Sequence, residues 1–190
     1  MSALNKVLAL LLISLAIINL NCGVKEEPPI IEDDNRFYYN EKCGCSVTLP
    51  EGWVLNKKRE FTGRLKIFLI QAFKPGLISN VVFTAQRNFD DEVTAEKAIK
   101  VEIAHLKTSA DKNFEVISEE PVCISGYVGH QMVDEFDWRG VRVYQKRIYF
   151  VRSKYIFALV LNSTTREAYK ECEPTFDKMV KSLKLPDLIP

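Results

Sequence analysis

Cysteines are the residues of this chain with the most distinctive chemistry, and there are five: Cys22, Cys43, Cys45, Cys123 and Cys172. Cys22 directly follows an apolar segment, and the four others form an even set of the kind that makes disulfides in exported proteins. Cys43 and Cys45 are separated by one residue, so we expect a bond between them to be strained. Each would then reach a distant partner, one Cys123 and the other Cys172, and the spacing leaves both pairings open.

The Cys-x-Cys motif at Cys43 and Cys45 has a second interpretation, as part of a redox or metal-binding centre. The Cys-x₂-Cys pairs typical of zinc sites are missing, and the two histidines, His105 and His130, lie far away without ligand spacing. The thioredoxin-type Cys-x-x-Cys context is absent as well. We therefore expect no metal and no cofactor, and keep a redox or metal-binding role of the two cysteines as the alternative function.

His130 and Asp134 are weak ligand candidates, because strand alternation places both on one face of the segment GHQMVDEF. They could share a proton, help to hold a cation, or form a partly buried hydrogen-bonded pair. Alternation places Glu135 and Asp137 on the opposite face, so the acidic residues do not converge as catalytic carboxylates would. We expect them to pair across strands with the basic residues of 139–152.

Signatures of common enzyme classes are absent from the sequence. It contains no Gly-x-Ser-x-Gly elbow, no glycine loop for phosphate and no His-Glu-x-x-His. The counts of Lys plus Arg (26) and Asp plus Glu (25) are almost equal, which argues against a basic surface for nucleic acid. The sequence therefore predicts no catalytic residue, no enzyme and no nucleic-acid partner.

The first 21 residues resemble a bacterial lipoprotein signal peptide. Lys6 precedes an apolar run over 7–20, which as a helix would reach roughly 21 Å and fall short of a hydrocarbon core of about 30 Å. Cys22 follows, where the lipoprotein signal places the acylated cysteine, although Asn19 and Asn21 depart from its usual Leu and small residue. We expect acylation of Cys22 to hold the chain on the membrane; an ordinary secretory signal or an uncleaved anchor is the alternative.

Residues 22–40 are predicted to form a flexible tether, and residues 41–187 a single globular domain. The tether is rich in Glu and Asp, and Pro28 and Pro29 favour an extended backbone. The whole chain has 190 residues, of which 47% are hydrophobic, enough for one domain with a buried core.

Periodicity of apolar residues predicts strands that alternate with two helices. Thr94 is a good N-cap for a helix of about 15 to 18 residues, and Pro121 suggests an edge strand. The last helix is interrupted by Pro174. Short connections between the later strands predict an antiparallel meander. The expected strands are 45–49, 66–73, 80–87, 114–124, 127–137, 141–151 and 155–162, and the second helix is 165–185.

Three segments resemble PsbP-like and DcrB-like domains. CSVTLPEGW is similar to their first strand and turn, the segment from Gly126 to Thr164 to their hairpin-linked strands, and EPTFDKMVKSLK to their closing helix. The resemblance covers about residues 44–186 and implies an α+β fold, an α-β-α sandwich with a mainly antiparallel sheet. It also implies a protein that binds or assembles something and is not an enzyme. No functional residue transfers from the family to a position here.

Together these observations predict a lipoprotein of the cell envelope that acts as a non-catalytic binding or assembly module. Its expected partners are the membrane, through lipid on Cys22, and an envelope protein or small ligand. The expected location is the periplasmic or extracellular side of a membrane.

Overall fold

The structure is a computed structural model that describes residues 37–40, 43–61, 67–73, 76, 79–87, 93–109, 112–152 and 154–185. The predicted signal peptide, Cys22 and the tether up to residue 36 lie outside the described residues. Within the described part, no helix has the length and apolar character that crossing a bilayer requires.

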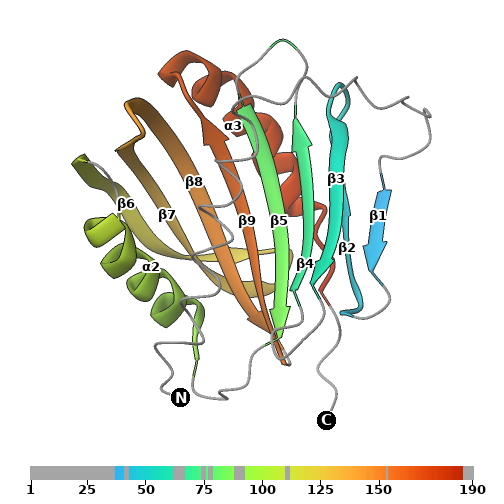
Figure 1. Ribbon diagram of the computed structural model, residues 1–190. Helices are drawn as coiled ribbons and strands as arrows, with labels where there is room; N and C mark the ends of the chain where they lie inside the picture. Colours follow the sequence, from blue (N-terminus) through green and yellow to red (C-terminus); the bar gives the residue numbers. More distant parts are fainter. Residues whose placement is uncertain are drawn as a thin grey trace.

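A seven-stranded antiparallel sheet lies at the centre of the molecule (Figure 1). Its order is β3-β4-β5-β9-β8-β7-β6. The strands β3, β4 and β5 form one meander, the strands β6, β7, β8 and β9 form a second, and the pairing of β5 with β9 joins the two. The strands are β3 (Val54–Phe61), β4 (Ile67–Phe73), β5 (Ser79–Arg87), β6 (Lys112–Ile124), β7 (Tyr127–Trp138), β8 (Val141–Arg152) and β9 (Tyr155–Ser163).

One helix covers each face of the sheet (Figure 1). Helix α2 (Ala95–Ser109) contacts β6, β7 and β8, whereas α3 (Arg166–Lys181) contacts β5, β8 and β9. Alternation along β8 shows the two faces: Tyr149 lies in the α2-side core, and Ile148 and Phe150 lie in the α3-side core. The predicted α-β-α sandwich of the α+β class is therefore confirmed.

Threonine caps start both helices. Thr94 Oγ1 accepts a hydrogen bond from the Lys97 N–H at 3.1 Å, and Thr165 Oγ1 accepts one from the Ala168 N–H at 3.2 Å. We expected Pro174 to kink the last helix or to open its second half, and the second of these is wrong, because α3 continues without a break through this exposed residue. The helix ends at Lys181, not at 185.

A second, two-stranded sheet pairs β1 (Phe37–Asn40) with β2 (Cys45–Thr48) in antiparallel register. An antiparallel bridge between Ser46 and Lys184, with both N–H···O distances at 2.9 Å, joins β2 to the segment after α3. The predicted tether included residues 37–40. Because these residues pair with β2, the folded domain includes them.

Candidate functional site

The turn between β1 and β2 is organised by Asn40. Its carbonyl accepts a hydrogen bond from the Gly44 N–H at 2.8 Å, and its Oδ1 accepts one from the Cys43 N–H at 3.2 Å. Gly44 has φ +64°, in the left-handed region that glycine adopts without a steric penalty. This turn lets the side chains on both sides of Gly44 meet.

Cys43 and Cys45 meet inside the α3-side core. Their side chains are 3% and 0% exposed, and their Sγ atoms are 2.6 Å apart. The hydrogen bond from Cys45 lowers the pKa of Cys43, while the same hydrogen bond and burial raise the pKa of Cys45. The shared hydrogen bond therefore favours ionisation of Cys43 over ionisation of Cys45.

The other two described cysteines lie on other elements, although Cys172 belongs to the same α3-side core as Cys43 and Cys45. Cys123 is exposed on β6, and Cys172 is buried on α3. No disulfide joins the four cysteines that the structure describes. The structure thus brings together the two cysteines that the sequence analysis expected to bond elsewhere.

Two aromatic side chains project from β1. Phe37 is 59% exposed and Tyr39 is 55% exposed, whereas Tyr38 between them packs on the α3-side core and accepts a hydrogen bond from Asn40 Nδ2 at 3.0 Å. Across the described residues, β1 pairs with β2 alone, so no other described strand lies along its second edge. The sequence analysis missed this aromatic edge because it assigned these residues to the tether.

His130 and Asp134 share a face of β7 as predicted, but each has a different partner. His130 Nε2 lies 3.2 Å from Glu119 Oε1 on β6, and Asp134 contacts Arg147 on β8. Four residues of extended strand separate the two candidates by roughly 13 Å, too far to share a proton or a cation. The structure therefore does not bring them together.

Asp134 belongs to a polar cluster buried beneath α2. Arg147, Asp134 and Glu102 are 0%, 1% and 2% exposed. Arg147 Nη1 donates to Glu102 Oε1, Arg147 Nη2 donates to Gln145 Oε1, and Arg147 Nε lies 3.0 Å from Asp134 Oδ2. Gln145 continues the chain of hydrogen bonds to Asn162. The cluster connects α2, β7, β8 and β9 from within.

Burial determines the protonation of this cluster. Desolvation, followed by the charge of Glu102, raises the pKa of Asp134. Desolvation also lowers the pKa of Arg147 to about 9, so its guanidinium stays charged at neutral pH. The Arg147 cation therefore lies between one carboxylate, Glu102, and one carboxyl that tends to keep its proton, Asp134. Together the three side chains carry almost no net charge, which lowers the cost of burying them. The arrangement supports a structural role for Asp134.

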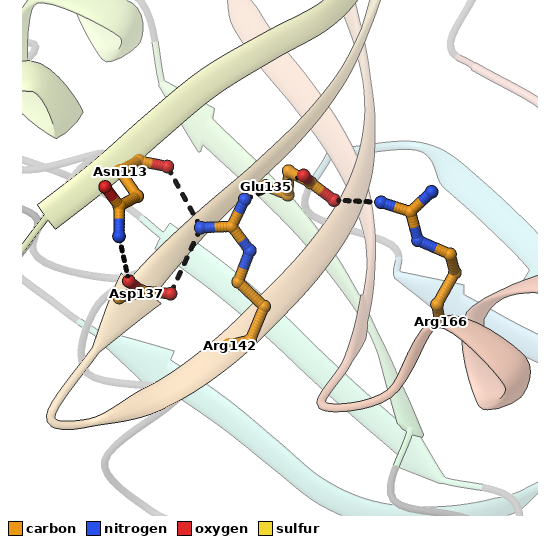
Figure 2. A network of polar contacts seen from close by, with 5 residues as sticks. All are labelled: Asn113, Glu135, Asp137, Arg142 and Arg166. Atoms are coloured by element: carbon orange, nitrogen blue, oxygen red, sulfur yellow. Dashed lines mark hydrogen bonds and ion pairs between the residues drawn. The ribbon is translucent and has the colours of Figure 1, made fainter.

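A second network lies on the other face of β7 (Figure 2). Arg142 on β8 binds Glu135 Oε1 at 2.7 Å and Asp137 Oδ1 at 3.1 Å, and Arg166 on α3 binds Glu135 Oε2 at 3.0 Å. Hydrogen bonds from Asn113 and Arg142 lower the pKa of Asp137. The predicted cross-strand pairing of opposite charges is confirmed, because Arg142 on β8 binds both Glu135 and Asp137 on β7.

The described residues contain no group of three or more His, Cys, Asp or Glu side chains arranged to hold a metal ion. The buried charges of this part of the chain are instead matched within the fold. Lys146, for example, is 7% exposed, and its Nζ lies 2.8 Å from Asp177 Oδ1 and 3.2 Å from Glu173 Oε1 on α3.

Comparison with known proteins gives a structural similarity alone. No family model and no curated protein matches the sequence. The solution structure of cyanobacterial PsbP from Synechocystis sp. PCC 6803 is 13% identical with a TM-score of 0.60, over 84% of this chain and 100% of that chain. Saccharomyces cerevisiae Ran-binding protein Mog1p is 10% identical with a TM-score of 0.50, over 78% of this chain and 94% of that one.

LpqN of Mycobacterium tuberculosis is 12% identical with a TM-score of 0.47, over 80% of this chain and 94% of that one. Similarity at such low identity is evidence of fold only. The sheet order, the two covering helices and the agreement with PsbP over its whole length show that this chain has the PsbP fold.

Proposed function

We propose that this chain is a lipoprotein of the cell envelope whose PsbP-like domain binds a partner protein and is not an enzyme. Its Cys22 would be acylated, and the domain would stand on the periplasmic or extracellular side of a membrane. The leader before Cys22 supports the anchor. The observation that carries the binding role is the pair of exposed aromatic residues, Phe37 and Tyr39, on β1, along whose second edge no other described strand lies.

A strand edge along which no other strand of the sheet lies can add a strand from another chain. Aromatic side chains are enriched at protein interfaces because each can bury a large apolar area. Phe37 and Tyr39 are each more than half exposed, so an extended partner segment along β1 would cover both. We therefore assign the contact to an extended segment of a partner protein.

The edge strand β6 is constructed differently. It contains Pro121, two register irregularities and the exposed glutamates Glu115, Glu119 and Glu120. Proline, bulges and like charges are the means by which edge strands avoid pairing with other chains. The contrast supports β1 as the edge that is kept for a partner.

Two further points support a module without catalysis. The charged side chains at Arg147, Lys146 and Glu135 are bound to internal partners. The same fold also occurs in Mog1p, a Ran-binding protein by its name, so a domain of this shape is compatible with holding another protein.

Site-specific photo-crosslinking tests the proposal in cells that naturally make the protein. A benzophenone amino acid is placed at position 37 or 39 of the full-length chain, and at Val141 as a control. Val141 is 42% exposed on β8, away from β1. We expect one discrete protein adduct from positions 37 and 39 and none from 141.

Affinity then separates a specific contact from a chance one. With the crosslinked protein purified, Phe37→Ser with Tyr39→Ser should weaken its binding by roughly 30-fold, as loss of about 2 kcal/mol at an interface predicts. Val141→Ser should leave binding unchanged. Equal affinities of the aromatic double variant and the original chain would refute the assignment of β1.

A further inference from the structure

The geometry points to a disulfide between Cys43 and Cys45, formed across Gly44 once the chain is in an oxidising compartment. The two thiols would constitute a local dithiol–disulfide couple in the β1–β2 turn. This inference does not depend on the proposed binding role, but it rests on the export that the proposed function includes.

The distance between the two sulfurs separates a disulfide from a metal chelate. Cys43 Sγ and Cys45 Sγ lie 2.6 Å apart. A disulfide bond measures about 2.05 Å, whereas two thiolates on a tetrahedral zinc with Zn–S bonds of about 2.3 Å lie roughly 3.8 Å apart. The observed separation is much closer to the bond. The described residues also supply no third ligand that would complete a metal site.

The backbone of the turn places the side chains of Cys43 and Cys45 next to each other despite their short spacing. Gly44, at φ +64°, reverses the chain so that both flanking side chains point into the same core. Asn40 holds this turn through its hydrogen bonds to the Gly44 and Cys43 N–H groups. The two sulfurs are thus brought together by the fold before any bond forms.

Pairing with Cys123 is opposed by the sheet itself. Val122 and Ile124 on β6 pack against the α3-side core that contains Cys43 and Cys45. Cys123 lies between them and is exposed, so its side chain points to the opposite face. A bond from Cys123 to either core cysteine would have to cross the sheet.

The bond forms by thiol–disulfide exchange with an external disulfide, either oxidised glutathione or the active-site disulfide of an envelope oxidoreductase. The Cys43 thiolate attacks one sulfur of that disulfide, giving a mixed disulfide and releasing one thiolate. Cys45 sulfur then attacks Cys43 sulfur and displaces the second thiolate. The two protons from Cys43 and Cys45 end on the two released thiols, so one disulfide is reduced as one is formed.

Peptide mass spectrometry tests the assignment on the full-length chain, exported by a bacterial host. Thiols are trapped with iodoacetamide in acid-quenched, urea-denatured protein before trypsin is added. Residues 43–57 form one tryptic peptide that contains Cys43 and Cys45, while Cys123 lies in 113–139 and Cys172 in 171–178. We expect peptide 43–57 to be unlabelled and two hydrogens lighter than its reduced form, and the other two peptides to be labelled.

Two variants make the result decisive without requiring correct folding. Cys123→Ser should leave peptide 43–57 bonded, whereas Cys45→Ser should expose Cys43 to the label. Label on both Cys43 and Cys45 in the exported chain would overturn the inference. So would a crosslinked pair of peptides that joins 43–57 to the peptide of Cys123 or Cys172.

Discussion

At the scale of single residues, Arg147 is a charged side chain that the fold holds away from water. It is fully buried, and its guanidinium lies between Glu102 on α2 and Asp134 on β7. Removing such a charge from water is expensive, and nearby carboxyl groups offset that cost. The same carboxyl groups become unmatched if the cation is lost, so the three residues act as one unit.

Arg147→Met should therefore lower the free energy of unfolding by about 3–5 kcal/mol, because it leaves two buried carboxyl groups without their cation. Arg142→Met is the matched control: its side chain is 28% exposed, and loss of such partly solvated ion pairs should cost about 1 kcal/mol or less. Urea denaturation at pH 7 measures both.

A triple variant tests the reason for the loss. When Arg147→Met is combined with Glu102→Leu and Asp134→Leu, no unmatched charge remains, and most of the stability should return. If Arg147→Met is no more harmful than Arg142→Met, the buried cluster does not stabilise the fold in the way its geometry suggests.

At the scale of elements, the pairing of β7 with β8 depends on Gly129. Gly129 lies opposite Phe150, and a Cβ atom at this position would come within 2.5 Å of Tyr149 O and 2.7 Å of Phe150 Cδ1. Phe150 is 1% exposed, and its ring packs edge-on against the ring of Tyr127, with the two ring centroids 6.3 Å apart. The aromatic ring thus occupies the space that glycine leaves open.

Gly129→Ala should destabilise the domain by about 1–3 kcal/mol, as overpacking of a well-filled core does. The clash involves a backbone carbonyl, which cannot move without disturbing the strand pairing. Gln131→Ala is the control on the same face of β7, and it should change the free energy of unfolding by less than about 0.5 kcal/mol. Thermal or urea unfolding of both variants gives the comparison, and equal stability of the two would contradict the packing argument.

Elements with strong local patterns could be predicted from the sequence. The meander from β6 to β9 has short turns and clear alternation, and Thr94 marks the start of α2. Alternation also placed Asp134 and Glu135 on opposite faces correctly. In contrast, β3 has the charged sequence VLNKKREF, without apolar alternation, and β1 depends on pairing with β2. Both strands were missed because tertiary pairing, not local pattern, forms them.

The candidate site was predicted less well than the fold, for two physical reasons. Spacing along the chain did not show that the side chains of Cys43 and Cys45 meet, because the positive φ of Gly44 is not visible in sequence. Alternation gave the face shared by His130 and Asp134 but not their partners on neighbouring strands, Glu119 and Arg147. Side-chain chemistry depended on three-dimensional distances that periodicity does not contain.

At the scale of the whole molecule, the proposed anchor and the aromatic edge of β1 are close in sequence. Fourteen residues separate Cys22 from Phe37. A flexible linker of that length has an end-to-end distance of about 21 Å. On the proposed anchoring, β1 would face partners near the membrane surface, and the remainder of the sandwich would stand further away.

Cys22→Ser should therefore change where the chain resides without changing its fold. The original chain should incorporate an alkynyl palmitate label, partition into the detergent phase of Triton X-114, and begin at an acylated Cys22 by mass spectrometry. Cys22→Ser should lose the label and the detergent partition, because a hydroxyl does not receive the thioether-linked lipid. Cys123→Ser removes an exposed thiol elsewhere and should behave as the original. The unfolding curve of Cys22→Ser should match that of the original chain, because the described domain starts at Phe37. Retention of label by Cys22→Ser, or an unlabelled original chain with its leader intact, would contradict the anchor.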